Sequence, residues 1–423
     1  MCAAITERAT CRLRIRRSAW EPALRRMLGR GTNFAFGSLR REAIPGGWLF
    51  LADELEVGDT VRGGALRSPQ EDWCVVTAGS PESLPIDRLI SGLQPRASQT
   101  LVLLLLDRQL PEACRLLLWH AGTLHPLDSC DIAGAGMLRL ERHVESASAP
   151  DERRSSRTRG ALGAQLHDRL RSATVTIVGT GRSGSQLSFL LAAAGVGRLR
   201  LVDADVLLPE NLDGMPGLTV EDQYEGKASA LAGRLLQFQP NLLVTCCEHP
   251  VNSTAARQVL QRPSDLLVST VDNDTARLCV SLLANRTLTP HLDVGTLVRQ
   301  SQSASGPPGL FADIRLLVPG SCVACVGGLA DADAAWYELN APVGSLQRGE
   351  PVQWSSQRSG SLAHLNTLAC SIAVELWLQL LRGEIDSWWQ RITWPIGGAL
   401  QVTGTAVQGS EDCLVCGSAG RPA

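Results

Sequence analysis

From about residue 160 onward, short apolar runs alternate with longer amphipathic stretches. The short runs are β-branched or aliphatic and predict strands, whereas the longer stretches repeat apolar residues at three- and four-residue spacing and predict helices. This alternation predicts an α/β fold: a doubly wound, Rossmann-like, mainly parallel sheet with helices on both faces. The expected strands are 174–178, 198–202, 242–247 and 265–270, and the expected helices are 161–171, 184–195, 225–238, 252–261, 274–287 and 362–381.

The earlier part of the chain has a different pattern. A helical stretch at Trp20–Met27 precedes several strand-like runs that have no regular helices between them, which predicts a smaller α+β domain. The expected strands there are 48–51, 73–77, 100–105, 115–118 and 137–140. Residues 148–159 are small, polar and charged, and we interpret them as a linker. The predicted domains are therefore 1–147 and 160–423.

Composition narrows the class of protein. A chain of 423 residues exceeds one ordinary domain, and its net charge of −2 gives no argument for a nucleic-acid partner. The longest apolar run, Leu101–Leu106, is far too short to span a bilayer, so we expect no membrane partner. The 13 cysteines are scattered and odd in number, unlike a disulfide framework, which predicts a reducing, cytoplasmic setting.

The most informative local feature is a glycine-rich turn between a strand and a helix. Gly179, Gly181 and Gly184 follow the strand at 174–178 with G-x-G-x-x-G spacing. Glycines let the backbone approach a phosphate closely, and the helix N-terminus presents N–H groups to it. Asp203 ends the next strand, 19 residues after the last glycine (203 − 184), where a carboxylate suits a ribose hydroxyl. The sequence therefore predicts a bound nucleotide.

Further polar residues follow the expected strand ends. Asp205 lies beside Asp203, Lys227 opens a later helix, and Asp272 follows another apolar strand. Because the carboxyl ends of parallel strands meet at one edge, we expect these side chains in one cleft. A second carboxylate there suits Mg²⁺ on a triphosphate, and a lysine suits phosphate oxygens. The set favours ATP over the dinucleotide of a dehydrogenase.

Four cysteines form two C-x-x-C pairs, and 87 residues lie between the pairs (413 − 325 − 1). Four thiolates with no open position predict a structural Zn²⁺ site that ties the C-terminus back onto the second domain. A redox C-x-x-C and an empty site are the alternatives. The four expected ligands are Cys322, Cys325, Cys413 and Cys416.

Together these motifs resemble the ThiF/MoeB/E1-type adenylating enzymes over about residues 155–417. The shared features are the glycine turn, Leu-Val-Asp-x-Asp, Asn-Leu, the helix lysine, Asp-Asn-x-x-x-Arg and the paired C-x-x-C. The resemblance implies that Mg·ATP adenylates the C-terminal glycine carboxylate of a ubiquitin-like protein and that pyrophosphate is released. It also implies a homodimer, and an E2-like protein is a further candidate partner.

The resemblance also implies roles for individual residues. Asp203 would hold the ribose, Asn211 and Lys227 would contact phosphates, and Asp272 would bind Mg²⁺. The family also uses an arginine just before the first helix, often from the partner subunit. The candidates for that role are Arg157 and Arg159, and exposure in a solvated linker is the alternative.

The chain departs from the family pattern at three places. The family usually has glycine where Arg182 stands and arginine-glutamine where Asp213-Gly214 stand. We hypothesise that Arg182 supplies the missing phosphate contact; a solvent-facing side chain is the alternative. Residues 326–369 contain no cysteine that could form a thioester, and Cys370 is expected in the core.

These departures resemble a bacterial branch of the family, in which some members carry a JAB/MPN-like domain first. The spacing of His120 and His125 does not fit a working JAB site, so we expect an inactive docking domain at 1–147. Two other functions stay open: adenylation of a small peptide terminus, and a nucleotide-binding scaffold that has lost catalysis.

Overall fold

The computed structural model divides the chain into two compact units, Met1–Ala149 and Pro150–Ala423. The structure describes residues 10–29, 34–44, 47–58, 72–79, 86–93, 95, 98–107, 114–134, 138–141, 152–299, 309–340 and 361–417.

The first unit is a mixed sheet with two helices among its described residues. Its strands are β1 (Thr10–Arg16), β2 (Phe34–Ile44), β3 (Gly47–Ala52), β4 (Glu56–Gly58), β5 (Asp72–Gly79), β6 (Thr100–Asp107), β7 (Cys114–His120), β8 (Thr123–Pro126), β9 (Ser129–Ala133) and β10 (Leu138–Glu141), and its helices are α1 (Arg17–Gly29) and α2 (Ile86–Leu93). The strand order is β10-β9-β1-β3-β2-β5-β6-β7-β8, and β4 pairs with β2.

Strand β6 explains the apolar run at 101–106, because side chains on both faces of this strand are buried. Val102 and Leu104 join the core that includes Trp20 and Met27 of α1. Leu101 and Leu103 point into a second core, which includes side chains of α2. An apolar strand with both faces covered shows no alternation of apolar and polar residues.

The second unit carries the predicted alternation of helices and strands. Its helices are α3 (Glu152–Leu162), α4 (Ala164–Ser172), α5 (Arg182–Ala194), α6 (Lys227–Phe238), α7 (Thr254–Leu260), α8 (Asp274–Arg286), α9 (Ala332–Asn340) and α11 (Ala363–Arg382). Its strands are β11 (Thr174–Val178), β12 (Arg198–Val202), β13 (Leu243–Cys247), β14 (Leu266–Ser269), β15 (His291–Arg299), β16 (Gly309–Leu317), β17 (Trp388–Pro395) and β18 (Gln401–Ala406).

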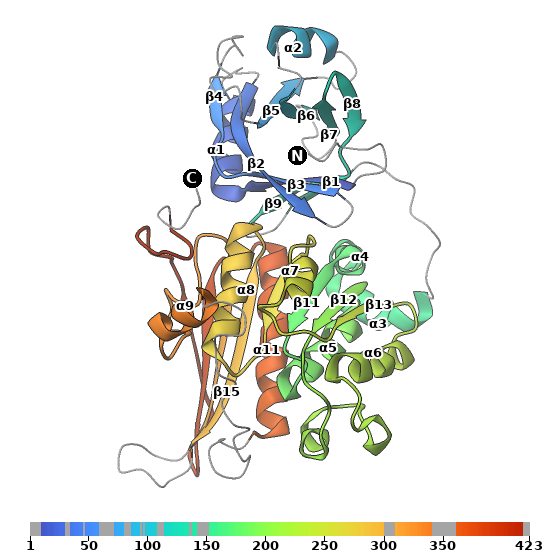
Figure 1. Ribbon diagram of the computed structural model, residues 1–423, viewed down its shortest axis with the longest axis vertical. Helices are drawn as coiled ribbons and strands as arrows, with labels where there is room; N and C mark the ends of the chain where they lie inside the picture. Colours follow the sequence, from blue (N-terminus) through green and yellow to red (C-terminus); the bar gives the residue numbers. More distant parts are fainter. Residues whose placement is uncertain are drawn as a thin grey trace. The chain divides into compact units, whose positions relative to one another are not determined.

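These strands form one sheet in the order β13-β12-β11-β14-β15-β16-β17-β18 (Figure 1). Strands β11 to β15 run parallel, which confirms the doubly wound, Rossmann-like α/β prediction. Helices α7 and α8 bury one face of this parallel part. Helices α5, α6 and α11 pack on the other face, with α11 against α5, β15 and β16.

The second unit differs from the sequence prediction at its first helix and in the antiparallel part of its sheet. The segment interpreted as a linker at 148–159 is helical from residue 152, and α3 belongs to the second unit. Helix α3 ends where Gly163 takes a positive φ of 82°, and α4 then begins. The antiparallel extension β16-β17-β18, and strand β15 that starts it, were not predicted.

His120 and His125 of the first unit lie on the neighbouring antiparallel strands β7 and β8. His120 Nδ1 is 3.1 Å from Thr100 Oγ1, and His125 pairs in register with Leu118. Burial is the main cause that lowers the pKa of His120, and the charge of Arg41 adds to it. The JAB/MPN-like interpretation of this unit stays a prediction.

Candidate nucleotide site and cysteine cluster

The sheet register brings three chain segments to one edge. Val178 of β11 is level with Val202 of β12 and with Ser269 of β14. The glycine turn, Asp203 and Thr270 each follow immediately, so they lie next to one another at the carboxyl ends of adjacent parallel strands. This is the edge at which doubly wound sheets bind ligands.

Two glycines of the turn are required by close packing. Gly179 has a φ of 88°, which side chains disfavour. A Cβ on Gly184 would lie 1.9 Å from the carbonyl oxygen of Gly179, so α5 could not approach the turn so closely with any other residue. A Cβ on Gly181 would meet nothing within 4 Å, which leaves space in front of the N-terminus of α5.

Two carboxylates join this turn to Lys227. Asp203 accepts hydrogen bonds from the backbone N–H and the hydroxyl of Thr180, at 2.6 and 3.0 Å. Its other oxygen accepts from the backbone N–H of Asp205 at 2.9 Å. The carboxylate of Asp205 accepts from Lys227 Nζ at 2.8 Å. The turn, the end of β12 and the start of α6 therefore form one connected polar unit.

Arg182 is held at the same edge by the turn Pro209–Gly214 and by Ser361. Its guanidinium donates to the carbonyl oxygens of Glu210 and Ser361, at 3.1 and 3.0 Å, and pairs with the carboxylate of Asp213. A Cβ on Gly214 would lie 2.7 Å from the stem of Arg182, so glycine makes room for the arginine. The two departures at 182 and 213–214 are thus one interlocked arrangement.

Asn211 and Asp272 occupy loops at this edge. Asn211 Oδ1 accepts from the backbone N–H of Leu208 at 3.0 Å and shapes the short 3₁₀ turn Pro209–Gly214. Asp272 is exposed and directly precedes Asn273, the N-cap of α8, whose Oδ1 accepts from the N–H of Ala276 at 2.8 Å. Thr270 donates its hydroxyl hydrogen to the carbonyl oxygen of Gly179, which joins the loop after β14 to the glycine turn.

The two arginines predicted from the segment before the first helix lie on α3. Arg159 Nη1 is 3.5 Å from Asp168 Oδ1 of α4, and Arg157 is exposed. Arg154 donates to the carbonyl oxygen of Phe238 at the end of α6. None of these contacts joins Arg157 or Arg159 to the glycine turn of the same chain.

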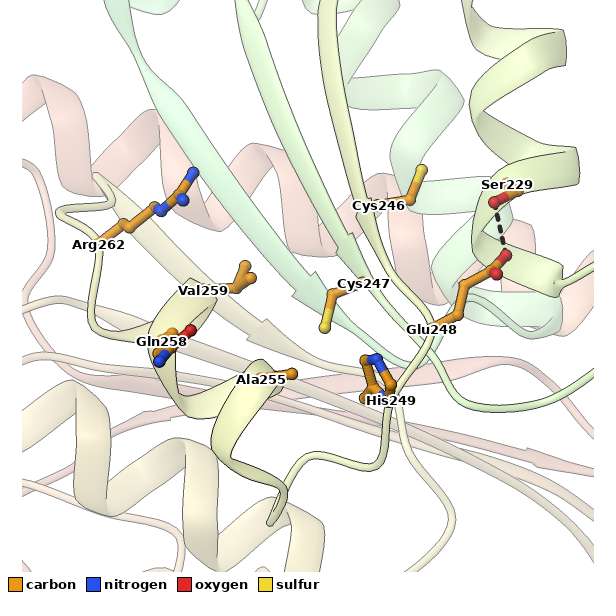
Figure 2. Close-up of a pocket in the computed structure, with 9 residues that line it drawn as sticks. All are labelled: Ser229, Cys246, Cys247, Glu248, His249, Ala255, Gln258, Val259 and Arg262. Atoms are coloured by element: carbon orange, nitrogen blue, oxygen red, sulfur yellow. Dashed lines mark hydrogen bonds between the residues drawn. The ribbon is translucent and has the colours of Figure 1, made fainter. Parts of the chain in front are cut away.

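A hollow of about 420 Å³, which was not predicted from the sequence, opens beside β13 (Figure 2). Its wall includes the end of β13 with Cys247 and His249, and Gln258 of α7. Glu248 also lines it and accepts a hydrogen bond from Ser229 of α6. The N-terminus of α6 abuts this wall, because a Cβ on Gly226 would lie 1.9 Å from Glu248 Oε1.

The four predicted cysteine ligands form a compact cluster, with all four sulfur atoms within 4.8 Å of one another. The Cys322–Cys325, Cys322–Cys413 and Cys325–Cys416 sulfur distances are 3.7, 3.5 and 3.5 Å. Sulfurs about 2.3 Å from one tetrahedral ion lie about 3.8 Å apart, so the arrangement fits Zn²⁺. Backbone N–H groups of Ser410 and Val415 point at two of the sulfurs, both at 3.4 Å.

The thiols of the cluster influence one another strongly. A hydrogen bond from Cys416 is the main cause that lowers the pKa of Cys322 to about 6, whereas burial raises the pKa of Cys325 to about 11. One thiolate thus forms readily and makes ionisation of the next thiol harder. A dication would compensate such crowded negative charge.

Cys370 of α11 lies outside this cluster. It is fully buried against α5, and burial raises the pKa of its thiol to about 12. Its predicted place in the core is confirmed.

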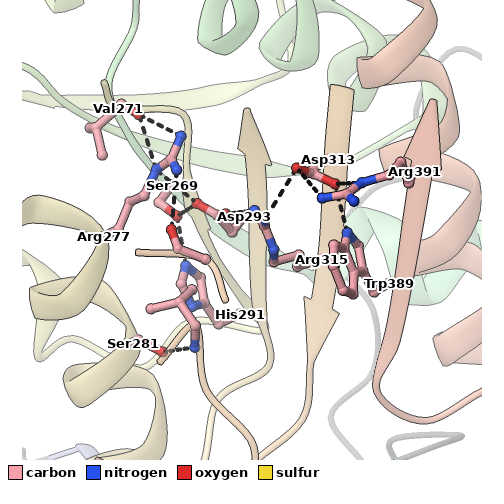
Figure 3. A network of polar contacts seen from close by, with 12 residues as sticks. Ser269, Val271, Arg277, Ser281, His291, Asp293, Asp313, Arg315, Trp389 and Arg391 are labelled. Carbon is pink, nitrogen blue, oxygen red and sulfur yellow. Dashed lines mark hydrogen bonds and ion pairs between the residues drawn. The ribbon is translucent and has the colours of Figure 1, made fainter. Parts of the chain in front are cut away.

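A buried polar network crosses strands β14 to β17, and sequence reasoning missed it (Figure 3). Ser269 Oγ lies 2.7 Å from both His291 Nε2 and Asp293 Oδ1. Asp293 is fully buried and also pairs with Arg315 at 3.0 Å and with Arg277 at 3.5 Å. Burial lowers the pKa of His291 to about 4, so this imidazole is neutral at pH 7.

The second unit is similar to known proteins in sequence. Residues 155–358 match the model of the ThiF family. The second unit contains a ThiF-family domain. A sulfur carrier protein adenylyltransferase of Thermus thermophilus is 35% identical over 120 residues, which are 28% of this chain and 44% of that protein. Ubiquitin-like modifier-activating enzyme 5 of Drosophila persimilis is 27% identical over 180 residues, 40% of this chain and 44% of that protein.

The chain spans less than half the length of these curated relatives. A solved structure of E. coli MccB with ATP aligns over 63% of this chain and 76% of that chain, with 21% identity and a TM-score of 0.47. Among the helices that the structure describes, none combines the length and apolar character needed to cross a bilayer.

Proposed function

We propose that this protein is an ATP-dependent adenylyltransferase that activates the C-terminal glycine carboxylate of a ubiquitin-like or sulfur carrier protein. The observation that carries the proposal is the connected unit of glycine turn, Asp203, Asp205 and Lys227 at the carboxyl edge of the parallel strands. The ThiF-family domain supports it, as do the adenylyltransferase and activating enzyme among its relatives.

The chemistry needs positioning and charge neutralisation more than proton transfer. The substrate carboxylate is already ionised, so it attacks the α-phosphorus of ATP without a general base, while the bond to the β-phosphate breaks and pyrophosphate leaves. In our proposal Asp203 and Asp205 orient the ribose, and Asn211, Arg182 and Lys227 hold the phosphates. Mg²⁺ at Asp272 would neutralise charge on the triphosphate.

We place the adenine toward the hollow beside β13. Strand β12 lies between β11, which leads into the glycine turn proposed for the phosphates, and β13, so a ribose held at the end of β12 leaves the β13 side for the base. The hollow adjoins α6, which starts at Lys227, so one nucleotide could contact both.

We propose that the protein acts as a homodimer in which Arg157 or Arg159 of one subunit reaches the site of the other. An E2-like protein is a further candidate partner, for the step after adenylation.

The cysteines whose side chains the structure describes are all free thiols, which supports a reducing, cytoplasmic setting.

The first test is exchange of labelled pyrophosphate into ATP with the full chain, Mg²⁺ and a candidate ubiquitin-like protein. We expect exchange only when the candidate has a free C-terminal glycine carboxylate. The matched control is the same candidate without its last residues. Exchange with a short peptide in place of a folded partner would favour the peptide alternative, and ATP binding without exchange would favour a scaffold.

A second prediction concerns Arg182 and Asp213. Arg182→Gly should weaken ATP binding on the order of tenfold, because in our proposal a charge-assisted contact to the β- or γ-phosphate is lost. Adding Asp213→Arg should recover much of that affinity, since the guanidinium then starts from the residue that Arg182 now contacts. The measurement is calorimetric titration with Mg·ATP.

AMP serves as the control ligand for this pair of variants, because it lacks the β- and γ-phosphates. Its affinity should change little in either variant. If Arg182→Gly binds Mg·ATP as tightly as the wild type, the proposed phosphate contact is wrong.

A further inference from the structure

One face of helix α8 is fastened to the segment that carries the first cysteine pair. Asp274 accepts from the backbone N–H groups of Ala330 and Asp331, at 2.6 and 2.9 Å. At the other end, Asn285 exchanges two hydrogen bonds with residues 320 and 321, at 2.9 and 3.0 Å. Positions 274, 277, 281 and 285 fall on one side of a helix because they are three or four residues apart.

Cysteine side chains complete this contact. Cys322 and Cys416 lie in the same buried cluster as Leu278 of α8. The backbone N–H of Val323 donates to Ser281 Oγ at 3.2 Å. The position of α8 therefore depends on the shape of the cysteine cluster, and the Asp272 turn immediately precedes this helix.

Arg277 bridges the segment that follows the first cysteine pair and the residue before Asp272; Figure 3 shows its contact with Val271. Its guanidinium donates to the carbonyl oxygen of Val271 at 3.2 and 3.3 Å, and to that of Gly328 at 3.3 Å. It also lies 3.5 Å from the buried carboxylate of Asp293. A Cβ on Gly295 would lie 2.8 Å from Arg277 Nη2, so the strand leaves a fitted space for the guanidinium.

We propose that Arg277 is a positioning residue that couples metal binding at the cysteine cluster to Mg·nucleotide binding at Asp272. The inference rests on the proposed function. A metal ion at the cluster fixes the Gly328 segment, Arg277 transmits that position to Val271, and Asp272 is the next residue. Both ligands then stabilise the same arrangement, so each strengthens the binding of the other by the same factor.

The test uses the full chain, either loaded with Zn²⁺ or depleted of it by a chelator that is removed before titration. Zinc depletion should weaken Mg·ATP binding on the order of tenfold, within the usual range for coupled sites. AMP binding should change little, because AMP needs neither Mg²⁺ nor Asp272. A general loosening of the fold would weaken both ligands equally and would overturn the proposal.

A variant in the zinc-loaded protein makes the test independent of the stability of the depleted form. Arg277→Met should lose about as much Mg·ATP affinity as zinc depletion does, keep its AMP affinity, and lose little more when zinc is removed. Asp293 keeps its partner Arg315 in this variant. The matched control is Asn285→Ala, which breaks contacts between α8 and the cluster segment far from Val271 and should lower only the melting temperature.

Two results would overturn the coupling while leaving the proposed function intact. One is unchanged Mg·ATP affinity in Arg277→Met; the other is an equal loss in Asn285→Ala. If the zinc-loaded wild type binds no Mg·ATP, the proposed function fails and this inference fails with it.

Discussion

Asp272→Ala should reduce ATP–pyrophosphate exchange by roughly 10²–10³, the usual cost of removing one group that stabilises charge in a transition state. Asp272 is exposed at the edge where the glycine turn and Asp203 lie, and its loop is fastened to that turn through Thr270. Without the carboxylate, Mg²⁺ would lose its protein ligand, and the charge on the leaving pyrophosphate would be neutralised less well.

Asp272→Asn sharpens this experiment, because it keeps the shape of the side chain and removes only its charge. We expect nearly the same loss of exchange, partly restored at high Mg²⁺ concentration. Glu221→Gln is the matched control: this carboxylate is 83% exposed in the same unit and should be dispensable. Full exchange in both Asp272 variants would remove the magnesium assignment.

The glycine turn and its carboxylate could be predicted because they depend on local sequence and on one rule of topology. Strand ends of a parallel sheet converge, so Asp203 had to lie beside the turn once both strands were recognised. The contact between Asp205 and Lys227 follows in the same way, since each residue stands at the end of a strand or the start of a helix. The parallel order β13-β12-β11-β14-β15, which was not predicted, brings these ends together.

The interlocked Arg182, Asp213 and Gly214 could not be predicted, although each departure was visible in the sequence. Their relation depends on the path of residues 204–214, which follows no regular element. The need for glycine at 214 can be seen only once the aliphatic part of the Arg182 side chain is known to pack against it. The departures from the family pattern at 182 and at 213–214 look like two separate losses in the sequence, but in the structure they form one interlocked set of contacts.

The antiparallel strands of the second unit escaped prediction for a different reason. All six residues of β18 are exposed, so no apolar pattern marks it. The segment at 152–159 looked like a linker because it is rich in arginine and serine. Its helix makes contacts that composition cannot show, such as the approach of Arg159 to Asp168 of α4 at 3.5 Å.

The buried network was hidden because its charged residues stand in strands that were not recognised. Asp293 and Arg315 are neighbours in β15 and β16 only through antiparallel pairing. A buried carboxylate is tolerated only when it is paired, and here Ser269, Arg277 and Arg315 satisfy it. The motif Asp-Asn-x-x-x-Arg was noted in the sequence, but the partners of its arginine are distant along the chain.

Cys413→Ser should lower the melting temperature of the second unit by about 10 °C, corresponding to a loss of roughly 4 kcal/mol in a unit of this size. The cluster joins the segment after β16 to the segment after β18, and Cys322 is fully buried while Cys416 is nearly so. Serine is a poor zinc ligand, so the metal would be held weakly and the remaining thiols would stay crowded. Differential scanning calorimetry measures the melting temperature and metal analysis measures the bound zinc. A chelator should reproduce the shift in melting temperature in the wild type.

Cys246→Ser is the control, because that exposed thiol lies outside the cluster and should change neither the melting temperature nor the zinc content. An unchanged melting temperature and no bound zinc in the wild type would favour an empty cluster, whereas a Cys322–Cys325 disulfide that forms and breaks reversibly would favour the redox alternative.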